Sequence, residues 1–225
     1  MNHRNEERYS RQRDIVPSDR IAACQATVIG VGAIGRQIAL QLTAMGVPWL
    51  QLIDHDLVEI SNLASQGYLE ADLGQLKVEA TAEQCRRINS AVQIHAVPNR
   101  FRRSLKIGNA LFCCVDSIVT RRLIWDATND LVAFFCDGRM TAEVVRILTA
   151  SDEPSRRHYP TTLFRAEEAF RGSCTAKTTI YCANVAAGLM TAQFARYLRL
   201  MPADWDTQFN LLSMELSAAG TERHC

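Results

Sequence analysis

Residues 27–62 read TVIGVGAIGRQIALQLTAMGVPWLQLIDHDLVEISN, and this stretch decides the fold. It begins with a short apolar run, Thr27–Ile29, which leads into three glycines spaced as G-x-G-x-x-G: Gly30, Gly32 and Gly35. A helical pattern follows, with one apolar face made of Ile34, Ile38, Leu42 and Met45. A second apolar run ends at Asp54. A strand, a glycine turn, a helix and a second strand closed by an acid predict a nucleotide-binding unit.

Each of these residue types has a physical reason to stand where it does. Gly30 allows a tight turn, Gly32 lets the backbone approach a phosphate, and Gly35 lets the helix pack closely on the strand. The start of the helix offers free N–H groups and a partial positive charge to an anion. Asp54 follows Gly35 at close to the spacing of about 20 residues expected for a carboxylate that binds ribose hydroxyls. The alternative is a glycine turn with a structural role alone.

The composition describes a globular protein and excludes several classes of partner. The chain of 225 residues is long enough to bury a core, and 48% of its residues are hydrophobic, so we expect one domain over residues 1–225. A net charge of +1 gives no electrostatic reason to expect nucleic acid or an anionic membrane as a partner. Residues 178–194 carry no charge, but their many polar and small side chains predict a buried helix instead of a membrane span.

The cysteines predict neither a zinc site nor a disulfide framework. The 8 cysteines include no C-x-x-C pair, and no H-x-x-x-H accompanies them. The first residues, MNHRNEERYSRQRD, have no apolar core and therefore do not resemble a signal peptide. We therefore expect reduced thiols and a cytoplasmic location. Cys113, Cys114 and Cys136 lie in apolar runs and are expected to fill space in the core.

Helical and strand-like patterns alternate along the rest of the chain. After an N-terminal arm and helix within residues 1–26, the patterns predict helices over 18–24 (with Ser18 as N-cap), 75–89, 119–130 and 178–200, and strands over 93–97, 111–115, 131–136 and 143–149. Polar loops are expected at 62–74 and 151–176, a basic surface segment at 100–109, and a strand or short helix, with strand favoured, at 209–216. The fold predicted is α/β and Rossmann-like, a mostly parallel sheet with helices on both faces.

In such sheets the ligand binds outside the carboxyl ends of the strands. Asp116 ends the continuous apolar run 111–115, as Asp54 ends the run before it. The glycine turn, Asp54 and Asp116 are therefore expected around one crevice.

An ordered set of short motifs now resembles a known family. Before the glycine turn stands Arg8-Tyr9-Ser10-Arg11-Gln12, after Asp54 come Ser61-Asn62-Leu63 and Gly74-Gln75-Leu76-Lys77, and Val115-Asp116-Ser117 ends a strand. Together these resemble the ThiF/MoeB/HesA superfamily, the bacterial relatives of ubiquitin-activating enzymes. The likeness spans roughly residues 8–216. Ordinary dehydrogenases share the glycine turn and the acid, but not the motifs on either side.

The resemblance implies an enzyme that uses ATP and Mg²⁺ to adenylate the C-terminal Gly-Gly carboxylate of a ubiquitin-like or sulfur-carrier protein. It implies nucleotide contacts at Gly30, Gly32, Gly35, Asp54, Asp56, Asn62, Lys77 and Asp116. Within this set Asp54 would bind the ribose, Asn62 and Lys77 the phosphates, and Asp116 Mg²⁺ or the reacting groups. Arg11 resembles an arginine that crosses a homodimer to reach the ATP of the other subunit.

The chemistry favours these residue types independently. Attack of a carboxylate on the α-phosphate brings two anions together, so catalysis must neutralise charge and fix geometry. Lys77, Arg11 and a cation held by Asp116 would do so. The plainer alternatives are that Lys77 is an exposed helical lysine, that Asp116 is a helix N-cap, and that Asp56 only caps a turn.

Two departures from the family pattern stand out. The family reads S-N-L-x-R-Q where this chain has Ser61-Asn62-Leu63-Ala64-Ser65-Gln66, so Ser65 takes the place of an arginine that meets the phosphates. The paired zinc ligands of many relatives are also absent.

Cys174 stands before the last long helix, where many relatives carry a cysteine that forms a thioester or persulfide. Arg171 and Lys177 flank it and would stabilise a thiolate. The alternative is an idle or buried thiol. Cys182, inside the helix, is expected in the core.

Three functions therefore compete. The first is ATP-dependent adenylation of a protein or peptide C-terminus, with or without transfer to a cysteine. The second is a non-catalytic or weakened family member that binds a ubiquitin-like partner, which Ser65 favours. The third is an NAD-dependent oxidoreductase, for which the sequence supplies no evident hydride-transfer acid.

Overall fold

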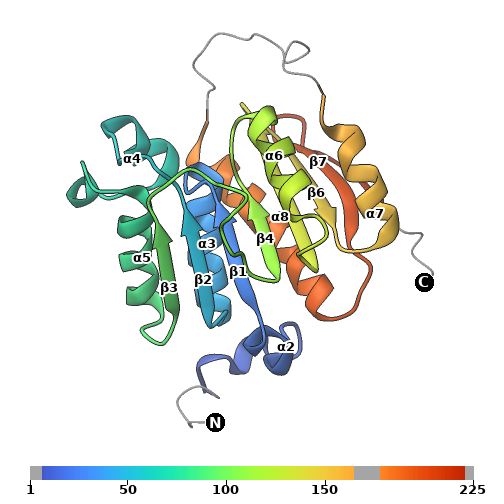
Figure 1. The fold of residues 1–225 in the computed structure, drawn as a ribbon, viewed down its shortest axis with the longest axis horizontal. Coiled ribbons are helices and arrows are strands. Elements are labelled where there is room, and N and C mark those ends of the chain that lie inside the picture. The colour runs from blue at the N-terminus through green and yellow to red at the C-terminus, as the bar shows by residue number, and fades with distance from the viewer. Residues whose placement is uncertain (1–6, 165–177, 221–225) are drawn as a thin grey trace.

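The computed structural model describes residues 7–164 and 178–220 and shows one sheet with helices on both faces (Figure 1). The eight strands stand in the order β3-β2-β1-β4-β5-β6-β7-β8. The part from β3 to β5 is parallel, and β6, β7 and β8 are added in antiparallel fashion. The strands are β1 Gln25–Ile29, β2 Trp49–Ile53, β3 Gln93–Val97, β4 Ala110–Cys113, β5 Phe134–Thr141, β6 Val144–Ala150, β7 Asp204–Asn210 and β8 Glu215–Gly220. The predicted fold class is confirmed.

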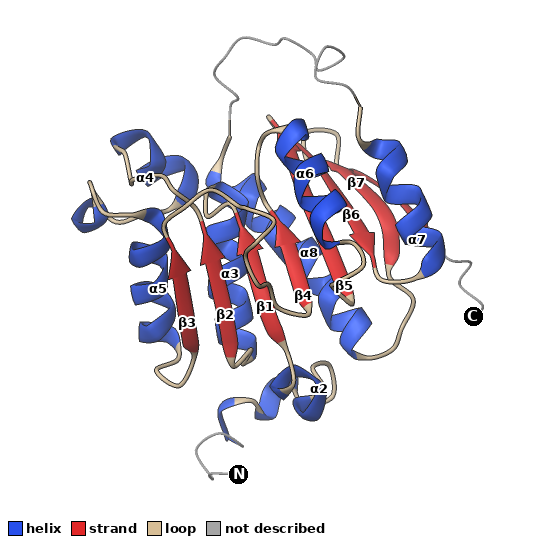
Figure 2. Ribbon diagram, in the orientation of Figure 1, coloured by secondary structure: helices blue, strands red, loops and turns tan. Residues whose placement is uncertain are grey.

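Two apolar cores lie on the two faces of the sheet (Figure 2). The larger one joins the sheet to α3, α5 and α8, and the smaller one joins it to α6 and the segment around Tyr159. The helices are α2 Ser18–Ala22, α3 Ala33–Met45, α4 Ile60–Gln66, α5 Lys77–Ile88, α6 Ile118–Thr128, α7 Glu153–His158 and α8 Ile180–Leu198, with short 3₁₀ turns η1 Ser10–Gln12, η2 Glu70–Asp72 and η3 Tyr159–Thr162.

The order of the strands explains where a ligand can bind. From β1 the chain moves outward through α3 to β2 and β3, and it then returns to the other side of β1 as β4. The connection that leaves β1 leads through α3 to β2 on one side, whereas the connection that leaves β4 leads through α6 to β5 on the other. The carboxyl ends of β1 and β4 therefore lie at a topological switch point, where a crevice is expected.

Two expected loops contain helices. The polar stretch after Asn62 forms α4 and η2, and α4 is closed at both ends by local bonds: a capping box between Glu59 and Asn62, and Gly67 in the left-handed conformation. In the expected loop 151–176, α7 begins at a capping box formed by Asp152 and Ser155. Neither segment has the hydrophobic periodicity of a helix, and hydrogen bonds at the helix ends stabilise it instead. Residues 165–177 lie outside the described residues.

Three boundaries also differ from the prediction. The strand expected at 131–136 runs instead from 134 to 141 and turns back as β6. The tail is not one strand over 209–216 but two, β7 and β8, joined by a turn at 211–214 in which Met214 has φ 57°. The first helix ends at Ala22 and is preceded by Pro17, so Ser18 is its first residue and not its cap.

The last long helix is a core helix, as predicted. Cys182, Ala186, Met190 and Phe194 are completely buried, and Thr179 caps its start. No helix among the described residues is long and apolar enough to cross a membrane.

Candidate active site

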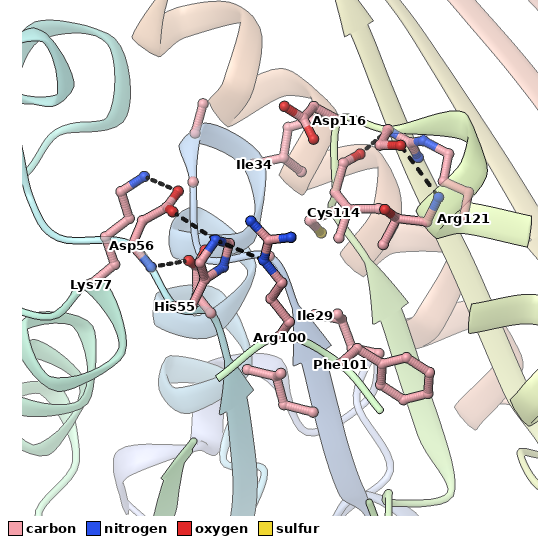
Figure 3. A pocket seen from close by; sticks show the side chains of 18 of the residues that line it. Ile29, Ile34, His55, Asp56, Lys77, Arg100, Phe101, Cys114, Asp116 and Arg121 are labelled. Carbon is pink, nitrogen blue, oxygen red and sulfur yellow. Dashed lines mark hydrogen bonds and ion pairs between the residues drawn. The ribbon is translucent and has the colours of Figure 1, made fainter. Parts of the chain in front are cut away.

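A crevice of about 850 Å³ opens at the carboxyl ends of β1, β2 and β4 (Figure 3). Its wall brings together Gly30 and Gly32, Asp54 and Asp56, Lys77, and Asp116. These residues come from separate parts of the chain, and the strand order places them around one space. The expected meeting of the glycine turn, Asp54 and Asp116 is therefore confirmed.

The glycine turn is tight where it meets the protein and open where it meets the crevice. Gly30 has φ +85°, and a Cβ there would lie 2.7 Å from the carbonyl oxygen of Cys114. A Cβ on Gly35 would collide with the carbonyl oxygen of Gly30. By contrast, the nearest atom to a Cβ on Gly32 would be Oε1 of Gln66, at 3.8 Å. Protein packing therefore requires Gly30 and Gly35, while Gly32 keeps space free at the start of α3.

Asp54 fastens the glycine turn to the end of β2. Its Oδ2 accepts a hydrogen bond from the backbone N–H of Val31 at 2.6 Å, and its Oδ1 accepts one from the N–H of Asp56 at 2.9 Å. Each oxygen keeps a further lone pair, so the carboxylate can still accept hydrogen bonds from ribose hydroxyls. Asp54 thus has a structural role in addition to the ribose binding expected of it.

Lys77 is buried and paired, not an exposed helical lysine. Its Nζ lies 3.1 Å from Oδ2 of Asp56, and its side chain is 8% exposed whereas that of Asp56 is 50% exposed. On the other side of Asp56, His55 accepts a hydrogen bond from Nε of Arg100 at 3.3 Å. Asp56 therefore holds the ammonium at the crevice wall, which is more than the turn cap considered as the alternative.

Asp116 is exposed in the crevice, on a turn whose backbone is held by the side chain of Arg121. Ser117, not Asp116, caps α6 by accepting a hydrogen bond from the N–H of Thr120 at 3.3 Å, so the capping alternative for Asp116 is wrong. The guanidinium of buried Arg121 donates to the carbonyl of Val115 and pairs with the fully buried Asp137. The carboxylate of Asp116 is thus presented to the crevice by a rigid support.

Cys113 and Cys136 are core residues, as predicted, whereas Cys114 is half-buried and lines the crevice just after β4. Burial raises the pKa of Cys136 to about 12 and raises the pKa values of Cys113 and Cys114 as well. These thiols therefore stay protonated and unreactive at neutral pH.

Two expected site residues lie outside the crevice wall. Asn62 is buried, and its Oδ1 accepts the backbone N–H of Glu59 at 2.9 Å in the capping box of α4. Arg11 is exposed on η1, and Gln12 of the same turn donates from Nε2 to the carbonyl of Met45, the last residue of α3, at 2.7 Å. Helix α3 starts at the crevice and ends at the opposite end of the strands, where the blue N-terminal segment lies in Figure 1. Because η1 is bonded to the end of α3, Arg11 lies far from the crevice of its own chain.

Comparison with known proteins decides the family. The model of the ThiF family matches residues 9–216. The chain belongs to the ThiF family. Among its relatives is the adenylyltransferase and sulfurtransferase MOCS3 of Mus musculus, 39% identical over 114 residues, which cover 48% of this chain and 25% of MOCS3. MOCS3 of Arabidopsis thaliana is 37% identical over 130 residues, covering 55% of this chain and 26% of the relative. The chain thus spans about a quarter of the length of these curated relatives.

Solved structures show the same fold. PaaA aligns with a TM-score of 0.80 over 98% of this chain and 74% of its own, at 16% identity. MccB of E. coli, in a crystal structure with ATP, aligns with a TM-score of 0.71 over 97% of this chain and 73% of its own, also at 16% identity.

The family resemblance also drew attention to Ser65 and Cys174. Ser65 lies on α4, and its hydroxyl donates to the carbonyl of Ser61 at 2.9 Å, so it offers no charge to the crevice. Cys174 lies outside the described residues.

Sequence reasoning missed part of the crevice wall. Gln66, Arg100, Phe101 and Thr178 all line it, although residues 100–109 were expected at the surface. Phe101 is buried, and this apolar residue within a basic segment was the available signal. Gln66 had no such signal, because its position depends on where α4 packs.

Proposed function

We propose that this chain is an ATP-dependent adenylyltransferase that acts on the C-terminal carboxylate of a ubiquitin-like or sulfur-carrier protein, or of a peptide. The supporting observation is the composition of the crevice at the N-terminus of α3. The crevice brings together the open turn at Gly32, the acid expected to bind ribose (Asp54), the buried Lys77 and the exposed Asp116. The names of the relatives support adenylyl transfer, and the MccB structure with ATP supports the nucleotide.

The reaction that we propose is a displacement at the α-phosphorus. A carboxylate oxygen of the partner attacks this atom, the bond to the bridging oxygen of the β-phosphate breaks, and pyrophosphate leaves with the electron pair. The product is an acyl adenylate. The protein has little proton transfer to perform, so its task is to position the two anions and to reduce their repulsion.

The groups in the crevice suit this task. The first N–H groups of α3 have no partner within the helix and can bind phosphate oxygens above Gly32. Lys77 lines the crevice, and we expect its ammonium to exchange Asp56 for a phosphate oxygen when the nucleotide binds. Asn62 would have to leave its capping box to do the same.

Mg²⁺ fits the residues present. Asp116 offers an exposed carboxylate in the crevice, and Mg²⁺ is usually held by one or two carboxylates together with phosphate oxygens. Bound there, it would neutralise phosphate charge. Asp54, His55 and Asp56 also bring ligand atoms within 4.8 Å of one another, but both carboxylates already bind backbone N–H groups or Lys77, so we assign no metal to them.

Arg11 would complete the site from a second subunit in a two-fold homodimer. In its own chain Arg11 is exposed at the end of the strands opposite the crevice. A C2 interface repeats each contact, so one arrangement would supply both crevices.

Nucleotide binding can be tested at Gly32. Gly32→Ala is expected to weaken ATP binding at least about tenfold, because the methyl group enters the space where we place a phosphate. Its backbone φ of −84° is not left-handed, so the fold should be retained. Isothermal titration calorimetry measures the affinity, and Gly188→Ala, in open space on α8, is the matched control. Equal ATP affinity in both variants, or NAD bound far more tightly than ATP, would overturn this assignment.

Transfer to a thiol is a separate proposal that rests on Cys174. Adenylation depends on phosphate contacts that we do not assign to this residue. Cys174→Ala should therefore keep ATP–pyrophosphate exchange and lose any covalent adduct with the partner. Cys182→Ala, inside the core, should lower stability instead. Intact mass spectrometry after reaction decides: an adduct that survives in Cys174→Ala would rule out the covalent role.

A further inference from the structure

Arg36, on the first turns of α3, is a buried arginine without an ion pair in the described part of the chain. The residue is 5% exposed, and its guanidinium lies 4.8 Å from the centre of the Tyr68 ring. Its Nε is buried and has no hydrogen-bond partner among the described residues. Burial lowers the pKa of Arg36. Asp72 attracts the cation electrostatically but forms no ion pair with it. A buried cation without a paired carboxylate is costly, and an anionic ligand in contact with it would reduce that cost.

Arg36 does not line the crevice itself, and its guanidinium lies behind the wall, beside Gly67 at the end of α4. The backbone N–H of Arg36 donates to the carbonyl of Gly32 at 3.0 Å, so the residue follows the open glycine by one helical turn. A Cβ on Gly67 would lie 3.6 Å from Nη1 of Arg36. Gly67 follows Gln66, which lines the crevice. Only a residue without a side chain therefore separates the guanidinium from the end of α4.

Gln66 gives a second, independent indication of a ligand. Its Oε1 is buried without a hydrogen-bond partner and lies 3.8 Å from the position of a Cβ on Gly32. The oxygen and nitrogen of an amide are assigned from their partners, so the NH₂ group can equally face this space. In that orientation Gln66 presents donors to the open side of the glycine turn. Its backbone carbonyl is held by Nε2 of Gln37 at 3.0 Å, which fixes the end of α4.

The pairing of the other charged residues around the crevice also supports an anion site at Arg36. Lys77 is paired with Asp56, and Arg121 is paired with Asp137. The α4 sequence, ISNLASQ, contains no charged residue. Arg100 contacts His55. Among the described residues at the α4 end of the crevice, Arg36 is thus a buried cation without an ion pair, and Asp72 acts on it only from further away.

We propose that Arg36, together with Gln66, binds the β- and γ-phosphates of the nucleotide. The guanidinium fork suits two oxygens of one phosphate, and the amide of Gln66 would donate to a third. Asp116 follows β4, whereas Arg36 lies beside Gly67 at the end of α4, so we place the reacting α-phosphate near Asp116 and the leaving pyrophosphate near Arg36. This assignment rests on the proposed function for the identity of the ligand, but the anion site itself does not.

The test compares nucleotides that differ in the terminal phosphates. In Arg36→Met the dissociation constant for ATP should rise roughly tenfold to a hundredfold, while that for AMP should change less than about threefold. Without nucleotide, the thermal midpoint of Arg36→Met should be equal to or higher than that of the wild type, because an unpaired buried charge has been replaced by an apolar side chain. Arg86→Met is the control, because it removes the same single positive charge from an exposed position on α5.

Inorganic tripolyphosphate separates this inference from the proposed function. If the wild type binds tripolyphosphate and Arg36→Met does not, the anion site is supported even where ATP is not the substrate. An unchanged ATP affinity in Arg36→Met, equal weakening of ATP and AMP, or a lower midpoint without nucleotide would each overturn the proposal. So would a wild-type protein that binds neither ATP nor tripolyphosphate.

Discussion

Asp116→Asn is expected to reduce ATP–pyrophosphate exchange by about 100- to 1000-fold without unfolding the protein. The substitution removes the negative charge that we expect to order the cation and the reacting groups, but it keeps the shape of the side chain. Asp116 is exposed, and the turn that carries it is held by Arg121 through the carbonyl of Val115, which the substitution leaves untouched. The measurement is steady-state exchange of labelled pyrophosphate into ATP, with thermal unfolding as the check on folding.

The same variant tests whether Arg11 acts across a dimer. Arg11→Ala should also be weakened, and heterodimers of Arg11→Ala with Asp116→Asn should regain part of the activity, since one of the two crevices is then complete. Arg13→Ala, an exposed arginine next to the same 3₁₀ turn, should behave as the wild type. Heterodimers that form but recover nothing would contradict a contribution in trans.

Gly35→Ala is expected to destabilise the fold by at least about 3 kcal/mol, which for a chain of this size lowers the melting temperature by roughly 6–12 °C. The added Cβ would collide with the carbonyl oxygen of Gly30 and would also lie 3.2 Å from Cβ of Cys114. Backbone cannot move aside as a flexible side chain can, so α3 would have to shift away from β1.

Gly188→Ala provides the control for this prediction. A Cβ at Gly188 meets no atom within 4 Å, and alanine favours a helix interior by about 1 kcal/mol over glycine. Differential scanning calorimetry should therefore find Gly188→Ala equal to or more stable than the wild type. A Gly35→Ala protein with the wild-type melting temperature would mean that the close approach of α3 to β1 is not required.

Local patterns predicted the core of the fold well. The unit from β1 through α3 to β2 was predictable because glycine spacing, helical periodicity and the terminal Asp54 all lie within one stretch of sequence. The burial of Lys77 was not, since it depends on Asp56, a residue from another part of the chain.

The missed elements show where local patterns fail. The α4 segment has no apolar stripe, and the bonds between Glu59 and Asn62 that begin it can be recognised only once a helix is assumed. In the tail, an apolar run over 209–216 hides the turn between β7 and β8. Arg36 and Gln66 come together only through the packing of α4 against α3, so no spacing in the sequence could have indicated their shared site.

The most direct test of adenylation is ATP–pyrophosphate exchange by the purified wild-type protein, measured with a panel of small ubiquitin-like and sulfur-carrier proteins that end in Gly-Gly. We predict that at least one of them stimulates exchange, and that removing its last glycine or blocking its terminal carboxylate abolishes the stimulation. A protein that binds ATP and one of these partners, yet catalyses no exchange with any of them, would contradict the account and favour a binding role without catalysis.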